Sequence, residues 1–143
     1  MTTAITRLYR FSASHRLHAP GLSAAENLAT YGKCNNPFGH GHNYVLEVTA
    51  AGDLDEQTGV LLPLAKLDRL VEETVLRGFA NSNMNVDVRQ FKHLVPTTEN
   101  VVLVITELLQ QNWETYLTGV PARLRRVHIQ ETDRNGFEVK LNA

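Results

Sequence analysis

The sequence predicts an α+β domain with its elements in the order ββααββ, and three observations carry this prediction. Two segments near the start and two near the end of the chain have the residue pattern of β-strands. Two segments between them carry apolar residues at helical spacing. Asn135-Gly136 separates the last two strands and is a hairpin signal, so we expect antiparallel pairing.

The first two strands are expected at residues 8–14 and 44–50, where aromatic and β-branched residues gather. Residues 19–39 lie between them, contain Gly, Asn and Pro, and are expected to form mainly loop. Long loops inside compact domains often carry function. This segment is therefore a first place to look for a site.

The first helix is expected to begin near Leu64 and to end near Gly78. The second is expected to begin around Thr98 and to run toward Trp113, because Thr98-Glu99-Asn100 is typical of a helix start. The last two strands are expected at residues 124–131 and 137–141, where apolar and polar residues alternate.

The composition is that of a single globular domain, which we expect to span residues 1–143. The chain is 43% hydrophobic and 20% charged, without an internal repeat, low-complexity tract or linker. Its net charge is −1, so we expect neither nucleic acid nor an acidic membrane as partner. The first residues lack the apolar core of a signal peptide. Cys34 is the single cysteine, which excludes an internal disulfide and favours a reducing cytoplasm.

Three of the six histidines form a candidate metal site. His40-Gly41-His42 places two imidazoles on the same side of an extended segment, because residues i and i+2 of a strand point the same way. His15 ends the first expected strand and could add a third nitrogen if the first two strands pair antiparallel. Three imidazoles suit zinc and leave a fourth position open for water or substrate. A pair of surface histidines remains the alternative on spacing alone.

The other histidines, His18, His93 and His128, are expected to be ordinary polar residues.

Cys34 lies six residues before His40 in a segment rich in Asn, Pro and Gly, which favours a thiol at the edge of a pocket. A reactive thiol needs a positive field or a base to lower its pKa from about 8.5. We expect Lys33 or a bound zinc ion to contribute that field.

Several segments together resemble the 6-pyruvoyltetrahydropterin synthase family. They are Phe11-Ser12-Ala13-Ser14-His15-Arg16-Leu17, Glu26-Asn27-Leu28, residues 32–43 with Cys-x5-His-Gly-His, Thr97-Thr98-Glu99-Asn100-Val101 and Glu131-Thr132-Asp133. They follow the order and spacing of the family across nearly the whole chain. The resemblance implies the T-fold (tunnelling fold), with a four-stranded antiparallel sheet and two helices on one face. It also implies a homohexamer, a dimer of trimers with active sites between subunits.

The resemblance also implies an activity and a set of residues for it. Family enzymes convert 7,8-dihydroneopterin triphosphate to 6-pyruvoyl-tetrahydropterin and release triphosphate. By this resemblance His15, His40 and His42 bind Zn²⁺, and Cys34 is the base that moves protons between carbons. Glu131 is the carboxylate that anchors the pterin ring. Thr97 and Thr98 are substrate-binding residues that seat it.

One departure from the family pattern concerns the proton relay. Family enzymes carry Leu-Asp-His-x-Asn-Leu after the first helix, where the His assists the Cys and the Asp orients the His. The matching residues here are Phe79-Ala80-Asn81-Ser82-Asn83-Met84, with Ala80 and Asn81 at the relay positions. Alanine holds no proton, and asparagine does not titrate near neutral pH. We therefore expect slow turnover.

Two other functions remain open at this point. One is 6-carboxytetrahydropterin synthase of the deazapurine (queuosine) pathway, although its usual pattern places fewer residues between Cys and His-Gly-His. The other is a non-catalytic pterin-binding protein, which Ala80 and Asn81 would permit. Arg10, Arg16 and Lys33 are the candidates for binding the triphosphate group.

Overall fold

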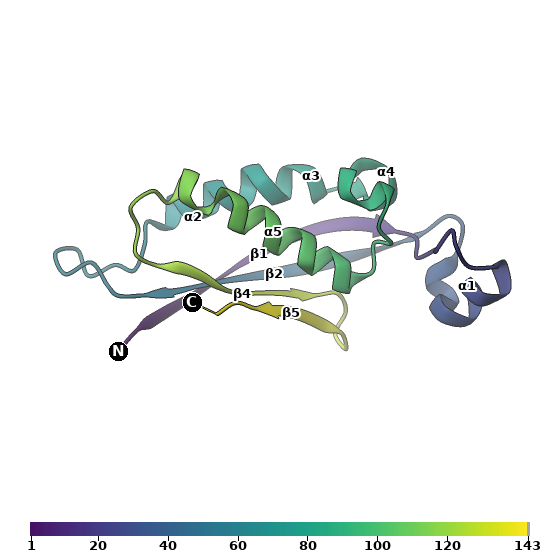
Figure 1. Cartoon of the computed structure of the whole chain (residues 1–143), viewed down its shortest axis with the longest axis horizontal. Coiled ribbons are helices and arrows are strands. Elements are labelled where there is room, and N and C mark those ends of the chain that lie inside the picture. The colour runs from purple at the N-terminus through teal and green to yellow at the C-terminus, as the bar shows by residue number, and fades with distance from the viewer. Residues whose placement is uncertain (143) are drawn as a thin grey trace.

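A five-stranded β-sheet forms one layer of the molecule, and helices cover one of its faces (Figure 1). The computed structural model describes residues 1–142. Strands β1 (Thr3–His15), β2 (His40–Gly52), β4 (Arg123–Gln130) and β5 (Gly136–Lys140) pair antiparallel in that order. This arrangement confirms the α+β class and the antiparallel pairing expected from the sequence.

The sheet has one strand more than the four that were expected. Strand β3 (Ser82–Asn83) pairs parallel with Ala13 and Ser14 at the outer edge of β1. Two residues are too few to carry a strand pattern in sequence, since alternation needs about four residues or more. The strand forms because the preceding helix ends beside β1.

Strands β1 and β2 are longer than their apolar residues indicated. Their pairing runs from Thr3 opposite Gly52 to His15 opposite His40. Because side chains alternate along each strand, Phe11 and His15 face the helices on β1, and Tyr44 does so on β2. The extra length matters, because His15 and His40 lie in the last pair of the ladder.

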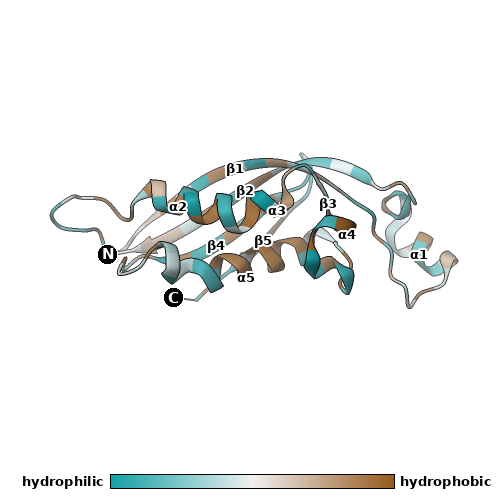
Figure 2. Cartoon of the chain, turned by 90° about the horizontal axis from the view of Figure 1, so that it is seen from above, coloured by the Kyte–Doolittle hydropathy of each residue, from teal (hydrophilic) through white to brown (hydrophobic). Residues whose placement is uncertain are grey.

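Two helical segments cover the sheet, as expected. The first is continuous through α2 (Leu64–Val71), η2 (Glu72–Leu76) and α3 (Arg77–Phe79), where η2 is a π-helical turn. The second is α5 (Thr98–Tyr116), and Figure 2 shows alternating apolar and polar colours along it. The fully buried Leu67, Val75 and Ile105 pack their apolar faces into one core. Short elements α4 (Met84–Asp87) and η3 (Arg89–Lys92) connect the two segments.

Residues 19–39 are not mainly loop, and this expectation was wrong. They contain α1 (Ala24–Tyr31) and the 3-10 turn η1 (Gly32–Asn35). Ser23 and Glu26 form a capping box at the start of α1, which stabilises a short helix locally. Asn27 is its single buried residue, so the helix has no apolar stripe for a sequence pattern to reveal. Figure 1 shows α1 standing beyond the end of the sheet.

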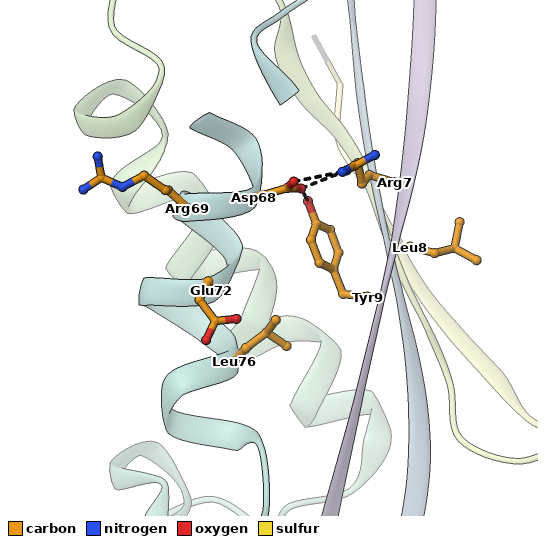
Figure 3. Close-up of a pocket in the computed structure, with 7 residues that line it drawn as sticks. All are labelled: Arg7, Leu8, Tyr9, Asp68, Arg69, Glu72 and Leu76. Atoms are coloured by element: carbon orange, nitrogen blue, oxygen red, sulfur yellow. Dashed lines mark hydrogen bonds and ion pairs between the residues drawn. The ribbon is translucent and has the colours of Figure 1, made fainter. Parts of the chain in front are cut away.

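A polar cluster ties the edge strand β1 to helix α2. Arg7 donates two hydrogen bonds to the carboxylate of Asp68, at 2.8 and 2.9 Å, and Tyr9 donates a third at 2.7 Å (Figure 3). Arg7 holds the pKa of the Asp68 carboxyl below its ordinary value, although burial opposes this. All groups in the cluster are paired, so we regard it as structural.

Within residues 1–142 no helix is both long and apolar enough to cross a membrane.

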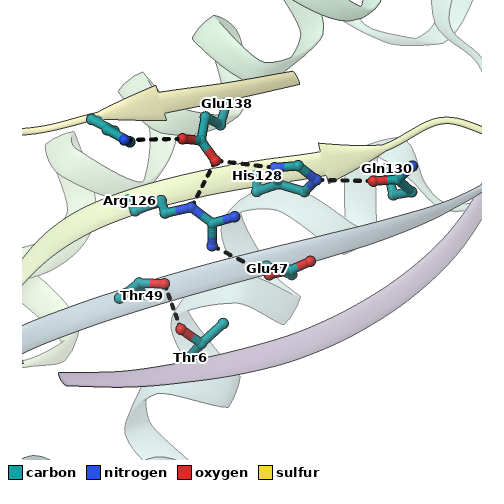
Figure 4. Close-up of polar contacts among 8 residues, drawn as sticks. Thr6, Glu47, Thr49, Arg126, His128, Gln130 and Glu138 are labelled. Atoms are coloured by element: carbon teal, nitrogen blue, oxygen red, sulfur yellow. Dashed lines mark hydrogen bonds and ion pairs between the residues drawn. The ribbon is translucent and has the colours of Figure 1, made fainter. Parts of the chain in front are cut away.

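Within residues 1–142 no helix covers the other face of the sheet (Figure 1), and polar side chains gather there (Figure 4). Arg126 bridges Glu47 on β2 and Glu138 on β5, and His128 lies beside Glu138 (Figure 4). The second ring nitrogen of His128 lies 3.0 Å from Gln130 Oε1. Both ring nitrogens of His128 thus have partners within this network. His128 pairs with Glu47 on β2, five residues along the strand from His42.

Candidate active site

Three histidines meet at the end of the β1–β2 ladder. His15 lies directly opposite His40, and His42 follows two residues later on the same strand. One ring nitrogen of each lies within 4.8 Å of those of the other two. His15 is buried, whereas His40 and His42 are partly exposed. The strand pairing therefore assembles residues that are 25 and 27 positions apart along the chain into one cluster.

The hydrogen bonds around the cluster leave nitrogens free to bind an ion. Nδ1 of His15 donates to the carbonyl of Pro96 at 2.8 Å, so its Nε2 carries the lone pair. That Nε2 lies 3.1 Å from Nε2 of His40. Nε2 of His42 is buried without a partner among the described residues. Unpaired buried nitrogens that converge on one point fit a metal ion, and three imidazoles suit Zn²⁺.

The surroundings of the cluster favour neutral imidazoles. Burial lowers the pKa of His15, and the charges of His40 and His42 lower it further, against the hydrogen bond to Pro96. Burial and the charge of His42 likewise lower the pKa of His40. A metal binds the neutral ring, so competition from protons is weakened.

Gly39 permits the approach of the loop to the first histidine. Its φ is +72°, and a Cβ at this position would lie 3.0 Å from the carbonyl oxygen of His15. Both the left-handed backbone and the contact disfavour any other residue. The glycine therefore brings the chain from Cys34 back to His40 within reach of β1.

Cys34 lies in η1 and is partly buried. Burial raises the pKa of its thiol, and the negative charge of Glu131 raises it further. We expected Lys33 or a bound zinc ion to lower this pKa. The side chain of Lys33 is exposed, and burial and Glu131 shift the pKa in the opposite direction. A thiolate at this position therefore needs an added positive charge, such as a bound cation.

Thr97 and Thr98 lie at the start of α5, and Glu131 directly follows β4. Thr98 donates a hydrogen bond from Oγ1 to the carboxylate of Glu131. Thr97 caps the helix, since its Oγ1 accepts from the backbone N–H of Asn100 at 3.2 Å. The charge of this carboxylate acts on the pKa values of both His15 and Cys34, and it raises both. The cap fixes the helix end that presents Thr98.

Tyr44 belongs to the same group, and sequence reasoning missed it. Its ring centroid lies 5.5 Å from that of His42, and its hydroxyl is buried. Burial and the charge of Glu131 raise the pKa of this hydroxyl well above its ordinary value. The available signal was its position two residues after His42, on the same face of β2.

Ala80 and Asn81 lie at the outer edge of β1, just after α3. Both are exposed, and the N–H of Asn81 donates to the carbonyl of Ser12 at 2.6 Å. Asn81 has φ +58°, a left-handed conformation that asparagine adopts more readily than most residues. No hydrogen bond within residues 1–142 joins either residue to Cys34.

The three candidates for binding triphosphate have different surroundings. Arg16 directly follows His15, and its Nε donates to the carbonyl of Asn35 at 3.2 Å. Arg10 and Lys33 are exposed, and Arg10 lines a hollow with Ala80 and Asn81 at the edge of β1. Arg16 alone of the three therefore adjoins both the histidine cluster and the η1 turn that carries Cys34.

The fold and the site define a class of small α+β proteins in which histidines from two paired strands form one cluster at the end of the sheet. A family model described as 6-pyruvoyl tetrahydropterin synthase matches residues 4–142. The chain therefore belongs to the 6-pyruvoyl tetrahydropterin synthase family, as its sequence segments indicated. Its solved relatives have the T-fold, and the fold assignment is confirmed.

Individual relatives align with this sequence over nearly its whole length. The 6-pyruvoyl tetrahydrobiopterin synthase of Homo sapiens is 44% identical over 131 residues, covering 92% of this chain and 86% of its own. That of Poecilia reticulata is 43% identical over 132 residues, covering 92% and 85%. The structure of Caenorhabditis elegans 6-pyruvoyl tetrahydropterin synthase has a TM-score of 0.88 and 39% identity, covering 99% and 97%.

Proposed function

We propose that this chain is a zinc-dependent lyase of the 6-pyruvoyltetrahydropterin synthase type, acting in tetrahydrobiopterin biosynthesis. It converts 7,8-dihydroneopterin triphosphate to 6-pyruvoyl-tetrahydropterin and eliminates triphosphate. The observation that carries the proposal is the cluster of His15, His40 and His42, whose ring nitrogens lie within 4.8 Å of one another. The charge of Glu131 acts on the pKa values of both His15 and Cys34. Family membership and relatives named for this activity support the same reaction.

The three histidines would hold the metal, and the hydrogen bond to Pro96 orients the ring of His15 for that purpose. When bound, zinc supplies Lewis acidity toward the hydroxyl groups of the substrate side chain. Glu131 accepts hydrogen bonds from the N–H groups of the pterin ring, and Thr98 orients its carboxylate. Capping by Thr97 keeps Thr98 in place.

Cys34 moves protons as the base, and its environment ties this role to loading of the site. Burial and Glu131 raise its pKa, so the thiol is protonated at neutral pH before a ligand arrives. Pterin N–H groups bound to Glu131 and a cation bound to the histidines would both offset the negative charge of Glu131, which disfavours the thiolate of Cys34. The base thus becomes effective when substrate and metal are both present.

The relay that assists the cysteine in the family is absent at Ala80 and Asn81. Loss of an acid–base partner costs about 10²–10⁴-fold in rate. These residues lie at the outer edge of β1 and form no hydrogen bond with Cys34 of the same chain within residues 1–142. In the homohexamer that we propose, they would serve an active site shared with a neighbouring subunit.

Restoring the relay tests this account. We expect the Ala80→Asp, Asn81→His variant to release triphosphate roughly 10²-fold faster or more than the unchanged chain. Histidine also tolerates the left-handed backbone at position 81, so the fold should be retained. Ala80→Asn, Asn81→Gln is a matched control, because it adds polar side chains that do not titrate. Equal rates in all three proteins would refute the relay argument.

Two further candidates are separated by their products. A 6-carboxytetrahydropterin synthase would leave a one-carbon carboxylate on the pterin, whereas the proposed enzyme leaves a three-carbon pyruvoyl group. Mass spectrometry of the product after turnover distinguishes them. A non-catalytic pterin-binding protein would bind the substrate and release no triphosphate at any pH. Metal analysis of the same sample identifies the bound ion.

A further inference from the structure

A cavity adjoins the histidine cluster and has no role in the function proposed so far. Its volume is about 420 Å³, within the range of roughly 300–1,000 Å³ for small-molecule sites. Arg16, His18, Lys92 and His93 line it, together with the buried Phe91 and Pro96. Four basic residues from two distant segments therefore surround one hollow beside the cluster.

The positive charges of this cavity are not compensated by the protein. Within residues 1–142 neither Arg16 nor Lys92 lies in an ion pair, and no carboxylate lines the cavity. The whole chain is close to neutral, with a net charge of −1. The concentration of unpaired cations is thus a local feature, as expected of an anion site.

Two of the basic side chains are held in place by hydrogen bonds. The backbone N–H and carbonyl of Arg16 both bond the side chain of Asn85, at 2.8 and 2.9 Å. The Arg16 Nε donates to the carbonyl of Asn35, which leaves the terminal nitrogens of its guanidinium available. The amide of Asn35 donates to Nδ1 of His18 at 3.1 Å, so Nε2 of His18 carries the proton and can donate.

The cavity and the histidine cluster share a wall. Arg16 is the next residue after His15, and Pro96 lines the cavity while its carbonyl accepts the hydrogen bond from His15. On the other side, the N–H of Leu17 donates to the carbonyl of Cys34 at 2.9 Å. The cavity therefore borders the histidine cluster at His15, and Arg16 and Leu17 connect it to the η1 turn of Cys34.

We propose that this cavity binds the triphosphate group of the substrate, with Arg16, His18, Lys92 and His93 as its donors. Two permanent cations and two imidazoles suit a ligand with several negative charges better than they suit a ligand with a single carboxylate. The proposal deepens the proposed function and rests on it. It selects Arg16 from the three candidates of the sequence and adds Lys92 and two histidines that we had expected to be ordinary polar residues.

The test measures binding, so it does not depend on turnover. Lys92→Gln, His93→Gln removes two of the donors, and both side chains are exposed, so the fold should be retained. Arg89→Gln is the matched control, because Arg89 lies in the same η3 turn and does not line the cavity. Calorimetry on zinc-loaded proteins of equal metal content would measure binding of inorganic triphosphate, of dihydroneopterin triphosphate and of dihydroneopterin without phosphate.

We expect the double variant to bind both triphosphate compounds roughly tenfold more weakly or worse, and the control to bind them as the unchanged chain does. Dihydroneopterin should bind all three proteins equally. Unchanged triphosphate binding in the double variant would overturn the proposal. The proposal would also be overturned if inorganic triphosphate bound the cavity without competing with dihydroneopterin triphosphate, because this result indicates a separate anion site. A protein that passes these tests yet releases no triphosphate would contradict the proposed function alone.

Discussion

At the scale of single residues, His42 and His128 show how the surroundings of a ring decide its role. Both lie on strands of the same sheet. Nε2 of His42 is buried without a hydrogen bond among the described residues, whereas both ring nitrogens of His128 have oxygen partners in Glu138 and Gln130. An unpaired buried nitrogen carries a desolvation cost that a metal ion relieves. His42 is therefore suited to ligation and His128 is not.

Removing one histidine of the cluster should abolish tight zinc binding. We expect the affinity of His42→Ala for zinc to fall by more than the roughly 10–100-fold that loss of an outer hydrogen-bonding partner costs. His128→Ala is the matched control on β4 and should bind zinc normally. Competition with a chelator, followed by metal analysis, measures both. Equal zinc affinity in the two variants would contradict the three-histidine site.

The charge of Glu131 should control the reactivity of Cys34. Because Glu131 raises the pKa of this thiol, Glu131→Gln should lower the pKa and increase the thiolate fraction at pH 7–8. Alkylation of the metal-free protein by iodoacetamide should then be several-fold faster in Glu131→Gln than in the unchanged chain. The difference should vanish at high pH, where the thiol is ionised in both proteins. Glu138→Gln, on the other face of the sheet, is the control and should alkylate at the unchanged rate.

At the scale of elements, the two helical segments follow their apolar patterns closely, but their ends and interruptions do not. The first segment contains the π-helical turn η2, which its apolar spacing does not indicate. Helix α5 continues to Tyr116, past the Trp113 expected from its apolar residues. The described structure adds α1, whose stability comes from its capping box and from Asn27, which bonds Ala19 through both backbone groups.

Helix α5 should show the energetic difference between its two faces. Ile105 is fully buried in the core, and Leu103 is 50% exposed on the same helix. Ile105→Ala should lower the free energy of unfolding by about 2–5 kcal/mol, because it removes buried methylene groups and leaves a cavity. Leu103→Ala should change it by about 0.5 kcal/mol or less. Urea unfolding followed by circular dichroism measures both, and similar losses would contradict the packing of α5.

At the scale of the whole molecule, the chain exposes more surface than a monomer of its size needs. Its accessible surface is 8612 Å², against about 7,400 Å² expected for a mass of 16.0 kDa. Most of β1 pairs on one side only, and β5 is the opposite edge of the sheet. Large apolar side chains are also exposed, with Phe38 at 96% and Val86 at 70%. Unpaired edges and exposed apolar side chains favour association.

We therefore expect the chain to assemble in solution, as the proposed homohexamer requires. Light scattering on the purified protein should give a mass of six chains that persists on dilution to micromolar concentration. Leu8 is 50% exposed on the edge strand β1, so Leu8→Glu should reduce the mass by placing charge at this edge. Leu54→Glu, in the loop after β2, is the control and should leave the mass unchanged. A monomeric unchanged chain would contradict the hexamer.

The sequence by itself determined the fold class, the approximate places of the long elements and the family. Alternation and helical spacing are local patterns, and each is set by which face of an element is buried. The segments around His15, Cys34, His40 and Glu131 carried the family assignment, because they occur in order across the chain. The metal ligation and the catalytic roles inferred from them remain predictions.

Only the tertiary structure decided how these residues lie relative to one another. Strand β3, the position of Tyr44 and the bond between His15 and Pro96 all depend on contacts between distant segments. The basic cavity does too, since Lys92 and His93 reach Arg16 across more than 70 positions of chain. The physical reason is that burial, pKa shifts and unpaired charge belong to the packed surroundings of a residue, which no local pattern encodes.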